Sequence, residues 1–242
     1  MRHRTQRPTL RALAPAVACA AVLAGCALPA NLRPAPGADD ATWLDQAAVS
    51  EVDGVEVVAQ ANAWPGDPQV PTEVTPIRVV IENDGVEPVR VRYQEFALVA
   101  DDGRSYAALP PYGVEGQVTD RVVVHNADPV FDPRFVHRDF FVVDTIGPTW
   151  YPDFDTYDGP FDRDVYYYEH YHEYWVDIDM PTPSMLAHVI PEGVVSPGGK
   201  VDGFLFFEKV DDDHSRVRFR ADMVAAATGD VLGEVSIPFV VD

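Results

Sequence analysis

Two parts of the chain carry the short apolar and alternating runs that form β-strands. Between residues 50 and 110, and again between 195 and 242, β-branched and aromatic residues cluster in such runs. Gly, Pro, Asn and Asp separate the runs at the spacing that is typical of an antiparallel β-sandwich. The pattern predicts strands over residues 55–60, 77–83, 89–99, 105–109, 203–210, 216–223 and 235–241.

The sequence Asn83-Asp84-Gly85 separates the second and third of these strands. These residue types tolerate a positive φ, which tight hairpin turns require. We therefore expect the strands over 77–83 and 89–99 to form a hairpin.

The third strand contains a break in its alternation. Its apolar residues first occupy odd positions and then, from Phe96 onward, even positions. A one-residue slip in a period of two would turn the apolar side chains to the opposite face. The pattern therefore predicts a bulge near Gln94 or Glu95.

Helical signals are sparse and concentrate in one place. Thr182 or Ser184 can cap a short helix over residues 185–190, which Pro191 and Gly193 would end. The predicted fold class is therefore mainly β: an antiparallel β-sandwich with a long insertion and one short helix.

The order of these features resembles that of small bacterial envelope lipoproteins with immunoglobulin-like domains. A strand, an Asn-Asp-Gly turn and a second strand are followed, late in the chain, by Pro197-Gly198-Gly199 and the Phe-rich strand over 203–210. The resemblance implies an immunoglobulin-like sandwich over residues 50–110 and 195–242. It implies a fold and no active residues.

The first 25 residues have the order of an export signal. A basic region without acids precedes an apolar stretch over residues 12–25, which is too short to span a bilayer. The basic residues are Arg2, Arg4, Arg7 and Arg11.

The apolar stretch ends in Leu23-Ala24-Gly25-Cys26, which resembles the lipobox of bacterial lipoproteins. The resemblance implies that the Cys26 thiol receives diacylglycerol, that the chain is cut before Cys26, and that the new amino group can carry a further acyl chain such as palmitate. An ordinary signal peptide cleaved within residues 27–30 is the alternative, which the proline of this segment disfavours.

These signals predict three parts: a lipoprotein signal peptide over residues 1–25, a lipidated Cys26 with a Pro-rich tether up to residue 48, and one β-sandwich domain over 49–242 with an insertion at about 125–180. Residue 27 is Ala rather than Asp. In lipoproteins of Gram-negative bacteria, this usually accompanies delivery to the outer membrane, so the resemblance implies a domain that faces the periplasm.

The charge of the chain excludes two classes of partner. Asp and Glu number 39 against 18 Lys and Arg, which gives a formal net charge of −21. Loss of residues 1–25 removes four arginines and no acid, so the charge becomes −25. Nucleic acids and anionic lipid surfaces attract cations, so we expect no nucleic-acid partner and expect lipid alone to hold the protein at a membrane.

The predicted insertion has an unusual composition. Eleven aromatic residues and seven acids lie between residues 150 and 175. Two interpretations stay open: the segment covers a sheet face or edge, or it forms a recognition surface, since Tyr and Trp dominate binding hot spots. The candidate interaction surface comprises Trp150, Tyr151, Tyr157, Tyr166, Tyr168, Tyr171, Tyr174 and Trp175.

The same segment holds candidate metal ligands. Asp153, Asp155 and Asp158 precede a glycine, as in a calcium loop, although their spacing departs from that of an EF-hand. His170 and His172 would place two imidazoles on one face of a strand, as in some copper and zinc sites. Surface acids and histidines without a metal are the alternative interpretation.

Motifs of catalysis are missing from the chain. It contains no Gly-x-Ser-x-Gly, no His-Glu-x-x-His and no phosphate-binding Gly-rich loop. We therefore expect a non-catalytic, lipid-anchored envelope protein without a required cofactor, which serves as a structural or protein-interaction module for an envelope partner. The alternative is a lipoprotein that binds calcium, another metal or carbohydrate through its Tyr/Asp-rich insertion.

Overall fold

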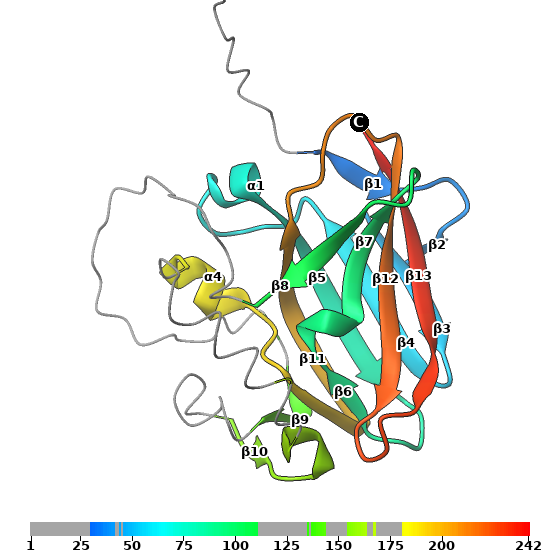
Figure 1. The fold of residues 1–242 in the computed structure, drawn as a ribbon, viewed down its shortest axis with the longest axis vertical. Helices are drawn as coiled ribbons and strands as arrows, with labels where there is room; N and C mark the ends of the chain where they lie inside the picture. Colours follow the sequence, from blue (N-terminus) through cyan, green and yellow to red (C-terminus); the bar gives the residue numbers. More distant parts are fainter. Residues whose placement is uncertain are drawn as a thin grey trace, which may run out of the picture.

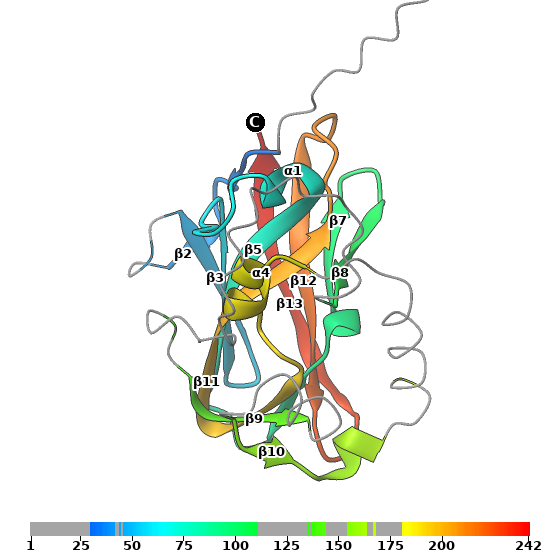
Figure 2. The ribbon, with the colours of Figure 1, turned by 90° about the vertical axis from the view of Figure 1, so that its left-hand side faces the viewer.

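The fold is an antiparallel β-sandwich, shown in Figures 1 and 2. It is known from a computed structural model that describes residues 30–41, 44, 46–110, 135, 137–143, 154–163, 167 and 181–242. All pairs of named strands are antiparallel except β9 with β10. The predicted fold class is confirmed, whereas the immunoglobulin-like topology stays a prediction.

Long strands form the centre of the sandwich, and the remaining strands are short. The strands are β1 (Leu32–Pro34), β2 (Asp39–Asp40), β3 (Ala47–Val52), β4 (Val55–Ala61), β5 (Val74–Asn83), β6 (Val89–Val91), β7 (Phe96–Ala100), β8 (Ser105–Leu109), β9 (Arg138–Val143), β10 (Thr156–Tyr157), β11 (Gly193–Glu208), β12 (Arg216–Ala225) and β13 (Val231–Val241). The helices are α1 (Val70–Glu73), η1 (Tyr93–Glu95), η3 (Pro160–Arg163) and α4 (Pro183–His188), of which η1 and η3 are 3₁₀ turns.

One hydrogen-bonded network of strands folds into two layers. The order β1-β13-β12-β7-β8 forms one layer, and β11-β5-β4-β3-β2 forms the other (Figure 2). The two layers join at a corner, where β8 and β11 pair through Leu109 with Phe206 and Ala108 with Phe207.

The core lies between the layers and is aromatic at its centre. Phe207 of β11 packs against Phe219 of β12, which also contacts Phe96 of β7. All three side chains are buried. Burial of one such side chain stabilises the fold by about 1.5–3 kcal/mol, so this cluster holds the two layers together.

The outer face of the second layer is also covered. Val58 and Val80 point away from the main core and form a second apolar cluster with Ala41 and Ala47. Leu44 packs against the same cluster. The outer face of β4 and β5 is therefore buried at Val58 and Val80, whereas the polar residues on either side of them are half-buried.

The expected hairpin at Asn83-Asp84-Gly85 does not form, because β5 pairs with β4 and β11 while β6 pairs with β11 and β12. The Asn83 amide explains this. Its Nδ2 donates to the carbonyls of Glu87 and Val195, and its Oδ1 accepts from the Gly85 N–H. The buried side chain thereby ties the turn to β11 and directs the chain toward β12.

The break in alternation is confirmed, but it is a 3₁₀ turn rather than a bulge. The turn η1 divides the expected strand into β6 and β7. Strand β12 pairs with β7 up to Ala221 and with β6 from Val224 onward. At η1, which lies between the strands β6 and β7 that pair with β12, polar side chains are buried.

Part of the expected tether belongs to the sheet. Strand β1 pairs with β13, and the buried Leu32 contributes to the main core. Asn62 Nδ2 donates to the Leu32 carbonyl at 2.7 Å and so links β1 to the end of β4. Leu32 therefore belongs to the folded part of the described chain although it precedes residue 49, because its apolar side chain fills the edge of the sandwich.

The expected helix is confirmed as α4. Thr182 is its N-cap, and its hydroxyl accepts a hydrogen bond from the Met185 N–H at 3.3 Å. Met185 is buried. Within the described residues, no helix has the length and hydropathy needed to cross a membrane.

Candidate functional sites

Three of the residues proposed from the sequence as site residues are described: Asp155, Tyr157 and Asp158. The lipidation candidate Cys26 lies outside the described residues. The same holds for Asp153, His170 and His172 among the metal candidates, and for Trp150, Tyr151, Tyr166, Tyr168, Tyr171, Tyr174 and Trp175 of the interaction surface.

The carboxylates of Asp155 and Asp158 are exposed at β10. Within the described part of the chain, neither belongs to a group of three side chains that could share a metal ion. The Asp155 carbonyl accepts from the Val142 N–H at 3.0 Å, which joins β10 to β9. The calcium loop therefore stays a prediction that depends on Asp153.

Tyr157 is half-buried and folds back on its own turn. Its ring centroid lies 6.4 Å from that of Phe161, and its hydroxyl end covers Gly159 so closely that a Cβ there would lie 2.3 Å from ring atoms. A larger residue at position 159 would therefore displace the ring of Tyr157. Tyr157 thus contributes to the packing of the insertion as well as to its surface.

Phe161 and Tyr167 of the insertion hold a buried arginine of the sandwich, Arg92. The side chain of Arg92 is only 1% exposed. Its guanidinium lies 4.4 Å from the ring centroid of Phe161 and 4.4 Å from that of Tyr167. Its Nη2 also donates to the Phe161 carbonyl at 2.9 Å. A planar guanidinium stacks well on aromatic rings, so Arg92 fastens this part of the insertion to η1.

Glu192, just ahead of β11, lies fully buried in the same cluster. Its Oε1 accepts from the Tyr93 N–H at 2.9 Å and from the Tyr167 hydroxyl. Its Oε2 is buried without a hydrogen-bond partner among the described residues. Burial raises the pKa of Glu192 to about 8, despite the Tyr93 N–H and the charge of Arg92, which lower it. The side chain is therefore largely protonated at neutral pH.

Glu95 is the second buried carboxyl of the cluster. It forms an ion pair with Arg90, and it accepts from the Arg92 N–H at 3.2 Å. Burial raises the pKa of Glu95 to about 7, against the charge and hydrogen bond of Arg90. We refer to Arg90, Arg92, Glu95, Glu192, Phe161 and Tyr167 as the Arg92 cluster.

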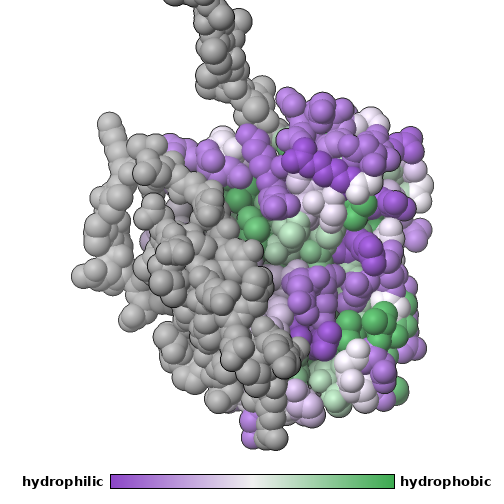
Figure 3. Space-filling view, viewed as in Figure 1, coloured by the Kyte–Doolittle hydropathy of each residue, from purple (hydrophilic) through white to green (hydrophobic). Residues whose placement is uncertain are grey.

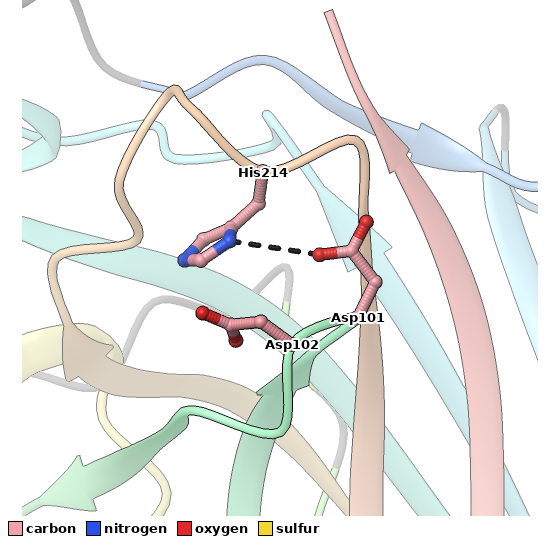
Figure 4. Close-up of side chains that lie close together, drawn as sticks. All are labelled: Asp101, Asp102 and His214. Carbon is pink, nitrogen blue, oxygen red and sulfur yellow. Dashed lines mark ion pairs between the residues drawn. The ribbon is translucent and has the colours of Figure 1, made fainter.

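A different group of residues offers metal ligands. Asp101 and Asp102, after β7, lie with His214, before β12, so that one ligand atom from each falls within 4.8 Å of the others (Figure 4). His214 Nδ1 is 3.6 Å from Asp101, and its Nε2 is 2.6 Å from the Tyr106 hydroxyl. If Nε2 donates to Tyr106, Nδ1 is left deprotonated and can bind a metal.

Asp211 and Asp213 form a second such group with His214. Asp211 forms an ion pair with Arg104 and accepts from the Tyr106 hydroxyl at 3.1 Å, whereas Asp101 accepts from the Ser215 hydroxyl at 2.6 Å. The sequence had indicated only turns at both places. Two acidic turns, one of them with a histidine, lie at the same end of neighbouring strands. This pattern could have indicated the group.

A pocket of about 320 Å³ opens where the described chain begins. Its lining is mostly apolar, with two amides, and it includes Ala30, four residues after Cys26. Trp64 at its wall donates its indole N–H to the Asp67 carbonyl at 2.9 Å. The lining residues are Ala30, Asn31, Leu32, Ala61, Asn62, Trp64, Pro71, Val74, Thr75, Pro76 and Ile77.

Exposed large apolar side chains are few among the described residues. Figure 3 shows small apolar areas separated by polar residues on the face that it presents. Among the described large apolar side chains, Val86 and Val231 are the exposed ones. Isolated apolar side chains are normal on soluble domains, so they do not indicate an interface.

Comparison with known proteins gives little guidance. No protein-family model matches the chain, and no curated protein gives a significant match. The crystal structure of the lipoprotein candidate YcdA from Bacillus subtilis aligns with 79% of this chain at 11% sequence identity and a TM-score of 0.35. The chain spans 38% of that protein. A likeness of this size carries no argument about fold or function.

Proposed function

We propose that the chain is a lipid-anchored, non-catalytic envelope protein whose β-sandwich serves as a structural or protein-interaction module. The observation that carries this proposal is the short path from Cys26 to the sheet. Leu32, the first residue of β1, follows Cys26 after only six Cα-to-Cα steps. Fully extended, they span about 20 Å. A lipid on Cys26 would hold this end of the sandwich close to a membrane.

The position of β1 fixes which end that is. The Asn31 carbonyl accepts from the Asp242 N–H, so the C-terminus lies beside the start of β1 (Figure 1). The turns 53–54, 84–88 and 226–230 lie at the other end, where β3, β5 and β12 finish. They would face away from the lipid.

The interaction role rests on the insertion. Its aromatic residues include the candidate interaction surface, and the contacts of Arg92 with Phe161 and Tyr167 fasten it to the sandwich. A surface that is fastened in this way loses less conformational entropy when it binds a partner. We infer that the insertion presents its tyrosines to another envelope protein.

The anchor is tested by replacing the two cysteines separately. We expect Cys26→Ser to release the protein from the membrane fraction or to leave it unprocessed, because the acylated thiol is lost. Cys19→Ser is the matched control, since Cys19 lies within the segment that the signal peptidase removes. Membrane-bound, normally processed protein from Cys26→Ser would refute the anchor.

The contact surface is tested by site-specific photo-crosslinking in whole cells. A photoreactive phenylalanine analogue at Tyr168 should give one discrete protein adduct. The same analogue at Arg218, an exposed position on β12, should not give it. Identical adducts at both positions, or none at Tyr168, would refute the insertion as the contact surface.

Metal binding is a second candidate function, which the grouping of Asp101, Asp102 and His214 favours. Two carboxylates and one imidazole suit zinc or manganese, and the carboxylates also suit calcium. Calorimetric titration with each metal should show one saturable site that Asp102→Asn removes. Asp212→Asn is the control, because Asp212 belongs to neither group. Equal binding by both variants, or no saturable binding, would exclude this site.

The insertion provides the other version of the metal hypothesis. A calcium-dependent rise in melting temperature that disappears in the double variant Asp153→Ala, Asp155→Ala would place calcium there. Carbohydrate binding by the aromatic residues of the insertion is the remaining alternative. It predicts quenching of tryptophan fluorescence by a sugar, which Trp175→Ala would reduce.

A further inference from the structure

The Arg92 cluster joins two elements that are distant in sequence at the place where the sheet is interrupted. Arg90 belongs to β6 and Glu95 to η1, with Arg92 between them, and Glu192 lies just ahead of β11. Phe161 and Tyr167 come from the insertion and contact Arg92. The charged and titratable groups described here are therefore two arginines, two glutamates and Tyr167.

Tyr167 has two contacts in this cluster, and both depend on the state of the buried polar groups. Its ring lies over the Arg92 guanidinium, and its hydroxyl donates to Glu192 Oε1. Glu192 Oε1 also accepts from the Tyr93 N–H. A neutral carboxyl group is well accommodated by these two donors.

An ionised Glu192 is poorly accommodated. The side chain has no exposed surface, and its Oε2 has no donor among the described residues. A buried charge that lacks hydrogen bonds is unfavourable, and water would relieve it. Tyr167 contacts this carboxylate directly and is only half-buried, so its displacement would expose Glu192 to water.

We propose that Glu192 and Arg92 form a proton-controlled latch, which holds Phe161 and Tyr167 on the sandwich while Glu192 is protonated and releases them when Glu192 ionises. The latch extends the proposed function, because it would regulate how the insertion presents its contact surface. Its test does not require a lipid or a partner, so the latch and the proposed function can fail separately.

The direction of the pH dependence follows from the two states. In the closed state burial raises the pKa of Glu192 to about 8, whereas a water-exposed glutamate titrates near 4.5. Between these values the closed state binds the proton and the open state has lost it. The opening equilibrium should therefore rise with pH by up to about tenfold per unit, and it should level off above pH 8.

The test is hydrogen exchange of the peptide that spans residues 154–163 in the full mature chain. Wild type is compared with Glu192→Gln at the same pH, so that the intrinsic exchange rate cancels. Glutamine keeps the acceptor for Tyr93 and Tyr167 but cannot ionise. The control is Glu51→Gln, which makes the same chemical change at an exposed position on β3.

We expect wild type to exchange faster than Glu192→Gln already at pH 6, and we expect the ratio of the two rates to be at least about tenfold larger at pH 8 than at pH 6. Glu51→Gln should follow wild type at both values. A ratio of wild type to Glu192→Gln that is the same at pH 6 and pH 8 would overturn the latch.

A second measurement covers the case in which Glu192→Gln does not fold. Carbon-13 NMR of the glutamate carboxyls in wild type should show one resonance that titrates near pH 8 together with the faster exchange. Ionisation of every glutamate by pH 6 would overturn the proposal.

Discussion

Phe207 of β11 and Phe219 of β12 meet edge to face between the two layers, with ring centroids 6.0 Å apart and ring planes at 79°. Both side chains are fully buried. Their residues belong to different layers of the sandwich, so this contact links the layers through side chains alone. Aromatic pairs in this geometry contribute about 0.5–1.5 kcal/mol beyond their burial.

Truncation of this pair should be among the most destabilising changes in the chain. We expect Phe219→Ala to lower the free energy of unfolding by about 3–5 kcal/mol, because it removes a buried ring and leaves a cavity. Val86→Ala, at an exposed side chain, should change it by less than about 0.5 kcal/mol. Urea unfolding measures both, and similar losses would contradict the assignment of the core.

Strand β1 should be part of the cooperative fold. Leu32 is buried against the core, whereas the ion pair of Arg33 with Asp242 is exposed. We predict a loss of about 2–5 kcal/mol for Leu32→Ala and of less than about 1 kcal/mol for Arg33→Ala. If Leu32→Ala is as stable as wild type by thermal unfolding, residues 32–34 act as a tether after all.

The cap of α4 should have a smaller effect. Thr182→Ala removes the side-chain acceptor for the Met185 N–H, and we expect it to lower the free energy of unfolding by about 0.5–2 kcal/mol. Ser236→Ala, at an exposed site on β13, is the comparison. Equal urea midpoints for the two variants would show that the cap does not contribute.

Glu95 should make stability depend on pH in the neutral range. Its pKa is raised by burial to about 7, so its contribution is fully present below pH 4.5 and is lost as the pH rises through 7. The free energy of unfolding should therefore fall more steeply between pH 5 and pH 7 in wild type than in Glu95→Gln. Glu87→Gln should keep the wild-type slope. Parallel curves for wild type and Glu95→Gln would contradict the raised pKa.

The elements that depend on local pattern could be predicted from the sequence. Strand alternation located the long strands, and Thr182 located α4, because periodicity and capping act over a few residues. The path of the chain after Asn83 could not be predicted, and the expected hairpin was wrong, since the amide makes its decisive hydrogen bond to Val195, far along the chain. The residue types of a turn show only which backbone conformations the segment can adopt. Here the hydrogen bond to a distant strand decides where the chain goes after the turn.

The sites were harder to predict than the strands. Arg92, Glu95 and Glu192 gave no signal of a site. Arg92 and Glu95 belonged to a predicted strand with a bulge, and the three residues become a cluster only when η1, β11 and the insertion meet. The group of Asp101, Asp102 and His214 arises in the same way, from two turns at one end of the sandwich. The expected surface of the insertion stays a prediction, since most of its residues lie outside the described part.

The most direct test of the account is the intact mass of the mature protein, combined with sequencing of its N-terminal peptide. The account predicts a chain that begins at Cys26 and carries diacylglycerol with or without an additional N-acyl chain. A mature chain that begins at another residue, or at Cys26 without an acyl group, would contradict the proposal of a lipid-anchored envelope protein.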